Sequence, residues 1–249
     1  MKGGATFRTY KAASAIRQSR RRCVFTNKQR QLVLGTLLGD GCLVNVKGAV
    51  TRRFTLVISH CKKQFEYIKH KRDALCVENN LRIEKSGYGS VRYRLNYSNP
   101  ALAEVAKIVL TDGKKTVTKE WLSQLTWEGI AYWFMDDGCL TTTKSGASNI
   151  TLCTNNCSQH ELDLICEHFS SLGFTFRVND EIKTRYMRIT KNKEALRFLA
   201  CVKKYVLPCF QYKVRSLLGV EYARMTSTEF CAKMMGFELR KQHKPKNGL

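Results

Sequence analysis

Two short stretches of the chain are nearly identical, and each places an acid at the end of an apolar run. Residues 37–43 read LLGDGCL and residues 134–140 read FMDDGCL, with the acids at Asp40 and Asp137. The two acids are separated by roughly the length of a small domain. A carboxylate repeated in this way predicts a two-fold arrangement in which both acids serve one site or a pair of related sites.

The position of these acids suggests their chemistry. Each follows an apolar run of helical character, and the carbonyl end of a helix carries partial negative charge, which disfavours a carboxylate unless a cation is near. One such Asp is ordinarily a capping or surface residue, but two in matched contexts need another explanation. Divalent ions held between carboxylates and phosphate oxygens support in-line phosphodiester hydrolysis. Because the ligands are oxygens supplied by few protein groups, Mg²⁺ is the expected ion.

The charge of the chain indicates what such a site acts on. The 249 residues include 43 Lys and Arg against 20 Asp and Glu, for a formal net charge of +23. An excess of this size points to a polyanionic partner, and nucleic acid is the first choice. An anionic membrane surface is the weaker alternative, and no apolar run is long enough to span a bilayer.

Cysteine usage bears on compartment and metal chemistry. The chain has eleven cysteines, and an odd number without a signal peptide favours free thiols in a reducing compartment. The nearest zinc-like group is Cys153, Cys157 and His160. It lacks a fourth ligand at the usual spacing, so a strand end leading into a helix is the favoured interpretation.

The N-terminal region is unusually basic. Residues 1–39 contain no Asp or Glu, and residues 20–22 are all Arg. Three interpretations remain open: a phosphate-binding arm, an organelle transit peptide, or a solvated leader. The arm is favoured because the basic excess continues through the rest of the chain.

The elements that must position the two acids follow from local patterns. Thr26 or Asn27 can cap a helix over residues 28–39, and period-two alternation predicts strands that bury one face. In the first half the expected elements are a helix over 28–39, a strand over 52–59, a helix over 62–77, a strand over 91–97 and a helix over 100–110.

The same order recurs after a connector over residues 111–125. The expected elements are a helix over 127–136, a strand over 149–153, a helix over 158–172, strands over 174–179 and 186–190, and a helix over 192–205. The repeated unit is helix–strand–strand–helix–strand–strand–helix, which predicts a pair of pseudo-symmetric antiparallel sheets.

One face of each predicted sheet is polar and basic. Arg, Lys, Asn, Thr, Ser and Tyr at these positions are the donors and acceptors that reach phosphates and base edges. A solvated face would normally carry Asp and Glu as well. The predicted DNA-contacting residues are Asn45, Lys47, Arg53, Thr55, Ser59, Arg92, Arg94, Asn96, Thr142, Lys144, Asn149, Thr151, Arg177, Asn179, Tyr186, Arg188 and Thr190.

The two acidic stretches carry a resemblance. Residues 33–41 (VLGTLLGDG) and 130–138 (IAYWFMDDG) resemble the two signature motifs of the single-chain LAGLIDADG homing endonucleases, and the likeness extends over roughly residues 28–220. It implies an α+β fold with two αββαββα halves, antiparallel DNA-binding sheets and a central interface of two motif helices. The implied division is a basic arm (1–25), a first half (26–112), a connector (113–125), a second half (126–224) and a C-terminal extension (225–249).

The resemblance also implies site residues. It makes Asp40 and Asp137 metal ligands, assisted by the main-chain carbonyls of Gly39 and Asp136. Two positions depart from the family pattern, which usually has small residues where this chain has Asp136 and Tyr132. The Asp136 side chain is interpreted as secondary, and Gly35 is expected to provide the space for close helix packing.

Two lysines complete the implied catalytic set. Lys115 and Lys213 match basic positions near the family's active sites, where they offset developing charge. They are separated by almost the same interval as the two acids, which favours a symmetric pair. The alternative for Lys213 is a phosphate contact without a catalytic role.

The expected function is site-specific, Mg²⁺-dependent double-strand DNA cleavage by a monomer encoded within a mobile intron, leaving short 3′ overhangs. The alternatives are an RNA maturase of the same fold that binds intron RNA as a splicing cofactor, and a catalytically silent DNA-binding regulator. The expected partners are double-stranded DNA and additionally intron RNA, with no membrane. The expected location is intracellular, in an organelle or in bacterial or phage-infected cytoplasm.

Overall fold

The computed structural model describes residues 24–45, 53–78, 81–85, 89–181 and 184–235. Lys47, nearly all of the predicted basic arm and the last part of the C-terminal extension lie outside these residues.

The first half begins with the motif helix α2, which starts after a capping box formed by Thr26 and Gln29. Its elements are α2 (Asn27–Leu38), β1 (Cys42–Asn45), β2 (Phe54–Cys61), η1 (Lys62–Gln64), α3 (Phe65–Ala74), β3 (Arg82–Lys85), β4 (Val91–Ser98) and α4 (Leu102–Val109). A short pair, β5 (Leu110–Thr111) and β6 (Lys114–Lys115), and the helix α5 (Lys119–Ser123) connect it to the second half.

The second half repeats this order. Its elements are α6 (Trp127–Asp137), β7 (Gly138–Thr142), β8 (Ser148–Cys153), α7 (Gln159–Ser171), β9 (Arg177–Glu181), β10 (Thr184–Ile189) and α8 (Asn192–Lys203). The chain continues through η2 (Pro208–Leu218), α9 (Val220–Arg224) and α10 (Ser227–Met234). The predicted αββαββα repeat is therefore confirmed.

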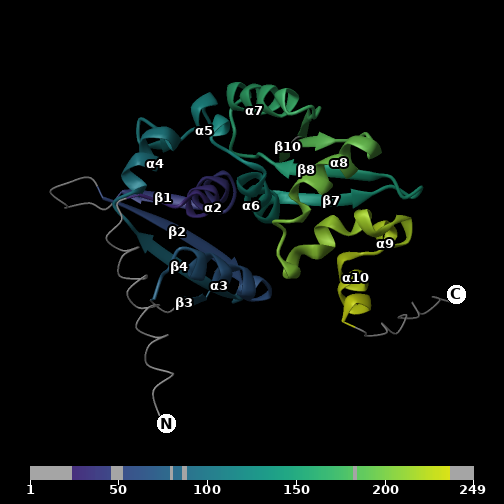
Figure 1. The fold of residues 1–249 in the computed structure, drawn as a ribbon, viewed down its shortest axis with the longest axis horizontal. Coiled ribbons are helices and arrows are strands. Elements are labelled where there is room, and N and C mark those ends of the chain that lie inside the picture. The colour runs from purple at the N-terminus through teal and green to yellow at the C-terminus, as the bar shows by residue number, and fades with distance from the viewer. Residues whose placement is uncertain (1–23, 46–52, 79–80, 86–88, 182–183, 236–249) are drawn as a thin grey trace, which may run out of the picture.

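Each half builds one antiparallel sheet of the same topology, with strand orders β1-β2-β4-β3 and β7-β8-β10-β9. The sheets lie on opposite sides of the paired helices α2 and α6, which Figure 1 shows side by side at the centre. Helices α3 and α4 contact the first sheet, and α8 contacts the second. Leu56, Ile58, Ile150 and Leu152 point into the resulting core and are fully buried.

The two motif helices approach closely because glycine lies at their contact. A Cβ atom at Gly35 would lie 2.1 Å from the carbonyl oxygen of Gly129, and a Cβ at Gly39 would lie 2.4 Å from the Asp136 Cβ. The predicted spacing role of Gly35 is thus visible, and Gly129 supplies matching space on α6. The large Tyr132 is accommodated beside Gly35, with its hydroxyl 2.9 Å from the His70 Nε2.

Some elements differ from the expected bounds. The strand predicted over 174–179 begins only at Arg177, because Phe174 and Phe176 are buried around Phe198 in an aromatic cluster. The connector contains a helix, α5, whose Trp121 is fully buried. None of the helices in the described ranges is long and apolar enough to cross a membrane.

Candidate active site at the ends of the paired helices

Both predicted acids lie where the motif helices end. Helix α2 ends at Leu38 with Gly39 as its cap, so Asp40 is the second residue beyond it; α6 ends at Asp137 itself. Burial and then the nearby charge of Asp40 raise the pKa of Asp137 from its ordinary 3.8 to about 7. Burial and then the charge of Asp136 also raise the pKa of Asp40. The ionised carboxylates are therefore held against an electrostatic penalty that a bound cation would relieve.

The two predicted lysines lie on the carbonyl ends of the same helices. Lys115 Nζ donates to the Leu37 carbonyl at 2.8 Å, and Lys213 Nζ donates to those of Met135 at 2.7 Å and Phe134 at 3.2 Å. Each ammonium thus satisfies last-turn carbonyls and offsets their partial negative charge. Lys115 is exposed, whereas Lys213 is buried, and burial lowers the pKa of Lys213 to about 8.

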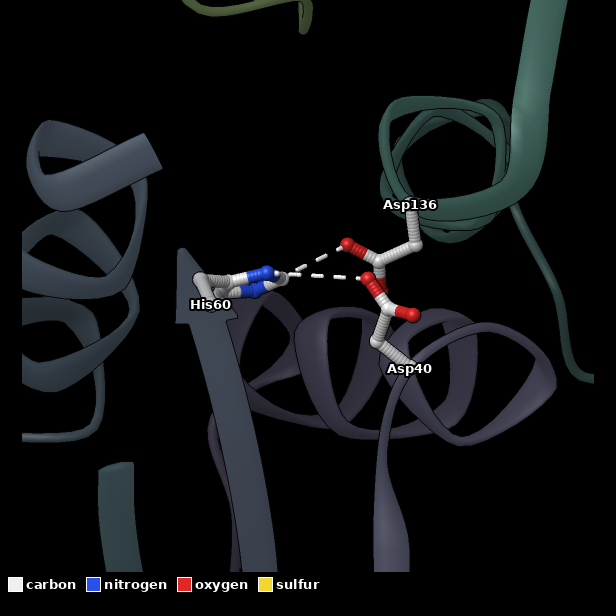
Figure 2. A group of neighbouring side chains, drawn as sticks. All are labelled: Asp40, His60 and Asp136. Carbon is white, nitrogen blue, oxygen red and sulfur yellow. Dashed lines mark ion pairs between the residues drawn. The ribbon is translucent and has the colours of Figure 1, made fainter. Parts of the chain in front are cut away.

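The Asp136 side chain has partners of its own. Its carboxylate is fully buried and accepts from Lys71 Nζ at 2.9 and 3.0 Å. The same ammonium lies 3.2 Å from His60 Nε2, while His60 Nδ1 lies 3.5 Å from an Asp40 carboxylate oxygen. Figure 2 shows His60, from β2, pointing between the two carboxylates from the motif helices.

The pKa values in this cluster reflect its burial. Desolvation and then the charge of Lys71 lower the pKa of His60 to about 3, so its imidazole is neutral at physiological pH. Desolvation also lowers the pKa of Lys71, whereas Asp136 opposes that effect. The Asp136 carboxylate thus favours the ammonium form of Lys71, against the effect of burial.

Sequence reasoning missed Lys71 and His60, although both interrupt a periodic pattern. Lys71 falls between Ile68 and Leu75 at helical spacing on the apolar side of α3, and all three are buried. His60 continues the buried alternation of Leu56 and Ile58 along β2. A charged or polar residue at a buried periodic position was the available signal.

Two groups of possible cation ligands lie in this region. Ligand atoms of Asp40, His60 and Asp136 lie within 4.8 Å of one another, but the Lys71 ammonium already contacts two of these residues. Asp40 and Asp137 instead offer carboxylate oxygens at the helix ends, next to the peptide units of Gly39 and Asp136. These oxygens fit a hard divalent ion such as Mg²⁺.

A cavity of about 330 Å³ borders Asp137 on the side of the second half. Its walls include Lys115, Cys153, Thr154 and the ring of Trp133. The surroundings of Asp137 therefore differ from those of Asp40, which faces His60.

The polar face of the first sheet brings its predicted DNA-contacting residues together. Ser59 is the cross-strand neighbour of Arg94, and Thr55 bonds to the neighbouring Ser98 at 2.7 Å. Arg92 and Arg94 both pair with Glu84 of β3, at 2.8 and 3.3 Å. Asn45, the last residue of β1, and Arg53, directly before β2, are exposed. Asn96 accepts a hydrogen bond from Arg94.

The second sheet repeats the arrangement. Arg188 is the neighbour of Thr151 on one side and of Arg177 on the other, and Tyr186 is the neighbour of Asn179. The remaining predicted residues lie at the strand ends. Thr142 and Asn149 lie in β7 and β8, Lys144 in the turn between them, and Thr190 directly after β10.

Comparison with known proteins agrees with this architecture. The model of the LAGLIDADG DNA endonuclease family matches residues 30–198. Protein RecA of Mycolicibacterium flavescens is 28% identical over 202 residues, covering 76% of this chain and 47% of RecA. DNA endonuclease I-ChuI of Chlamydomonas applanata is 28% identical over 226 residues, covering 76% of this chain and 95% of I-ChuI.

The chain spans about half the length of its RecA relatives. Among solved structures, the homing endonuclease I-WcaI bound to its DNA recognition sequence has a TM-score of 0.68 at 19% identity. The match covers 80% of this chain and 91% of that structure. Because the family model matches more than half of the sequence, the chain belongs to the LAGLIDADG DNA endonuclease family.

Proposed function

We propose that the protein is a site-specific endonuclease that hydrolyses both strands of double-stranded DNA with Mg²⁺. One observation carries this proposal: Asp40 and Asp137 lie together at the ends of the paired helices, where burial and then the charge of Asp40 raise the pKa of Asp137. A bound cation would relieve the repulsion between two carboxylates held in this way, and hydrolysis of a phosphodiester is a reaction in which they and that cation act together.

The relatives support the same substrate class. I-ChuI, which this chain matches over 95% of its length, is named a DNA endonuclease. I-WcaI, which shares the fold, was solved on its DNA recognition sequence. The net charge of +23 and the basic faces of both sheets are suited to DNA.

The residues of this chain would divide the work. The polar faces of the two sheets would bind the duplex and place a phosphate of each DNA strand near the helix ends. Asp40 and Asp137 would hold Mg²⁺, with the carbonyls of Gly39 and Asp136 as further oxygen donors. Bound Mg²⁺ supplies a polarised water and neutralises phosphate charge. Lys115 and Lys213 would offset the charge that develops on the phosphate.

The duplicated architecture supports a monomer in which each half attends one DNA strand. Since both acids and both lysines are present in one chain, a second copy is not required to complete either site.

A cleavage selection tests the proposal. Purified protein is incubated with a randomised double-stranded DNA library in Mg²⁺, and the cleaved molecules are sequenced. We expect enrichment of one extended site, cut on both strands, with no cleavage in EDTA. Binding in Ca²⁺ to the selected site, measured by gel shift, separates recognition from chemistry. If no library sequence is cleaved in Mg²⁺ or Mn²⁺, although selection for binding in Ca²⁺ recovers a tightly bound site, the enzymatic assignment is contradicted.

A further inference from the structure

Three buried polar side chains beside the catalytic acids have no part in the function proposed above. The side chains of Lys71, Asp136 and His60 are completely inaccessible to solvent. Burying an ion pair removes both charges from water, and that penalty offsets much of their attraction. Their presence beside the helix ends therefore calls for a role other than stability.

None of the three has a counterpart in the other half. Cys42 pairs with Val57 in the first sheet and Cys139 with Thr151 in the second, so the position equivalent to His60 is Thr154. Helices α3 and α7 begin at the equivalent Phe65 and Gln159, which aligns Lys71 with the buried Ile165. Asp136 corresponds to Gly39 in the repeated motif. Lys71 and His60 of the first half thus stand where the second half has isoleucine and threonine, and Asp136 of the second half stands where the first half has glycine.

The hydrogen bonds of the cluster have a defined direction. An ammonium can only donate, so Lys71 Nζ donates to both Asp136 oxygens and to His60 Nε2 at 3.2 Å. His60 Nε2 must therefore present its lone pair, which leaves the imidazole proton on Nδ1. Within the part of the chain that the structure describes, Nδ1 has no hydrogen-bond partner at normal distance. The Asp40 carboxylate lies 3.5 Å from this Nδ1, and the Gln64 side chain also interacts with the ring.

The cluster is held from several sides. The Lys71 ammonium lies 4.1 Å from the centre of the Tyr67 ring, and that ring also packs against His60. Tyr67 in turn contacts Phe210 of η2 edge-on. The lysine is therefore confined between an aromatic face and the Asp136 carboxylate, and the histidine cannot turn away from Asp40 without disturbing this packing.

We propose that Lys71, anchored by Asp136, fixes His60 in the Nδ1–H tautomer, and that His60 thereby orients the Asp40 carboxylate as a positioning residue. This inference rests on the proposed function. Because His60 faces Asp40 and the equivalent position beside Asp137 is Thr154, the two active sites are unequal. Loss of this positioning slows cleavage of one DNA strand and leaves the other at its normal rate.

The tautomer is tested in the metal-free protein without DNA. The protein is labelled with ¹⁵N-histidine, and two-bond ¹H–¹⁵N spectra distinguish protonated from unprotonated ring nitrogens. The His60 signals are assigned by their loss in His60→Gln. We expect a neutral ring with its proton on Nδ1 in the wild type. The double variant Lys71→Ile with Asp136→Gly gives each position the residue that its equivalent in the opposite half has. In this variant we expect a mixture of tautomers. A wild-type ring protonated at Nε2, or at both nitrogens, would overturn the proposal.

Cleavage is then followed with each DNA strand labelled separately. The double variant removes a buried charge pair together and so avoids an unpaired buried carboxylate. We expect one DNA strand to be cut about 10–100-fold more slowly, as for other residues that orient metal ligands. Nicked DNA should accumulate. Ile165→Val, a core change at the position equivalent to Lys71, should leave the ratio of the two strand rates unchanged.

The outcomes separate the two proposals. Equal slowing of both DNA strands, or none, would show that the cluster only stabilises the fold, and would overturn the positioning role. If the wild type cuts no DNA, the proposed function fails. The tautomer measurement would still decide whether Lys71 fixes the His60 ring.

Discussion

At the scale of single residues, the helix-end acids are coupled by proximity. Asp137 is partly buried next to Asp40, and its raised pKa shows that ionising both groups is unfavourable in the metal-free protein. Lys115 and Lys213 offset only part of the negative charge of the two acids, because both lysines also donate to main-chain carbonyls. The site is thus prepared to gain a cation.

The first prediction concerns these two acids. Replacing either Asp40 or Asp137 with Asn keeps the size of the side chain but removes a negative ligand, so the rate of double-strand cleavage should fall by at least about 100-fold. Affinity for the same DNA in Ca²⁺ should change little, because in the proposed function the sheets would supply most contacts. Single-turnover rates and gel shifts measure the two effects. An Asp137→Asn protein that cuts both DNA strands at the normal rate would remove Asp137 from the site.

The second prediction concerns pH. The folded protein holds a proton on Asp137 up to about pH 7, whereas an unfolded chain releases it near 3.8. Between these values the folded state binds more protons, so this group's contribution to stability is full below about pH 4 and is lost as pH rises through 7. In EDTA, Asp137→Asn should therefore melt at a higher temperature than the wild type at pH 8.

That advantage should disappear near pH 4, where calorimetry compares the two proteins again. Asp163→Asn is the matched control, because Asp163 is an exposed carboxyl on α7. A melting difference for Asp137→Asn that stayed constant from pH 4 to 8 would contradict the raised pKa.

At the scale of elements, the paired helices depend on contact between main chains. The Gly35 position on α2 leaves no room for a Cβ because the nearest atom is a Gly129 carbonyl. At Gly129 a Cβ would instead meet the end of the Gln31 side chain at 2.5 Å. Side-chain ends move more readily than backbone, so the two glycines are not equivalent.

The third prediction follows from this difference. Gly35→Ala should lower the free energy of unfolding by about 1–3 kcal/mol, because overpacking outweighs the better helix propensity of alanine. Gly129→Ala should be less destabilising, although it disturbs the hydrogen bond that the Thr126 amide donates to Gln31 Oε1. Urea unfolding monitored by circular dichroism compares both variants with the wild type. If Gly129→Ala lowered the free energy of unfolding as much as Gly35→Ala or more, the predicted difference between the two glycines would be wrong.

The fourth prediction concerns the outer face of the first sheet. Arg92 and Arg94 share the carboxylate of Glu84, which holds both guanidinium groups on that face. If one of them reads guanine, its change to Ala should cost about 1–3 kcal/mol and relax preference at one base pair. Selection of cleavable targets by each variant measures this, with Arg177→Ala as the counterpart in the second sheet.

Glu84→Gln serves as the matched test of the ion pair. It should strengthen binding to all sequences by removing a negative charge near DNA, without changing base preference. If neither arginine variant alters the preferred base at any position, the two side chains contact the backbone alone.

At the scale of the whole molecule, two sheets flank the paired helices α2 and α6, and the chain carries a large positive charge. In the proposed DNA complex, phosphate contacts spread over two sheets would release many counterions. The affinity of the molecule is therefore expected to be governed by salt more than that of a protein with one small binding patch.

The fifth prediction quantifies that effect. Raising salt from 50 to 200 mM should weaken DNA binding by about 10³-fold or more, as for proteins with six or more phosphate contacts. Arg53→Gln should reduce the slope of log affinity against log salt by about one if Arg53 binds a phosphate. Fluorescence anisotropy across a salt series gives both values. A binding constant that does not change over this range would exclude a large electrostatic contribution.

Much of this molecule could be predicted from its sequence, because its patterns are periodic. Alternation along β2 and β4, the cap at Thr26, and the repeated acidic motif predicted the duplicated fold. The strand β3 was missed because Ile83 is its only apolar residue, and that side chain is exposed. Nothing local distinguishes such an edge strand from a loop.

The candidate site was predictable only in part. Asp40 and Asp137 were found because they repeat, whereas His60 and Lys71 do not. Their roles depend on the Asp136 side chain of the other half, which reaches them only when α2 and α6 pack together. Local sequence patterns do not reveal a contact between segments so far apart.

The bond between Lys71 and Asp136 also limits how the two halves can be recombined. It is made by a residue of one half and a residue of the other, so neither half carries it alone. Consider a chimera in which residues from α6 onward follow a different first half with an apolar residue at position 71. It would bury the Asp136 carboxylate without its lysine partner. Such a graft should fold only when Asp136 is exchanged for Gly at the same time. The halves of this protein are therefore not freely interchangeable modules.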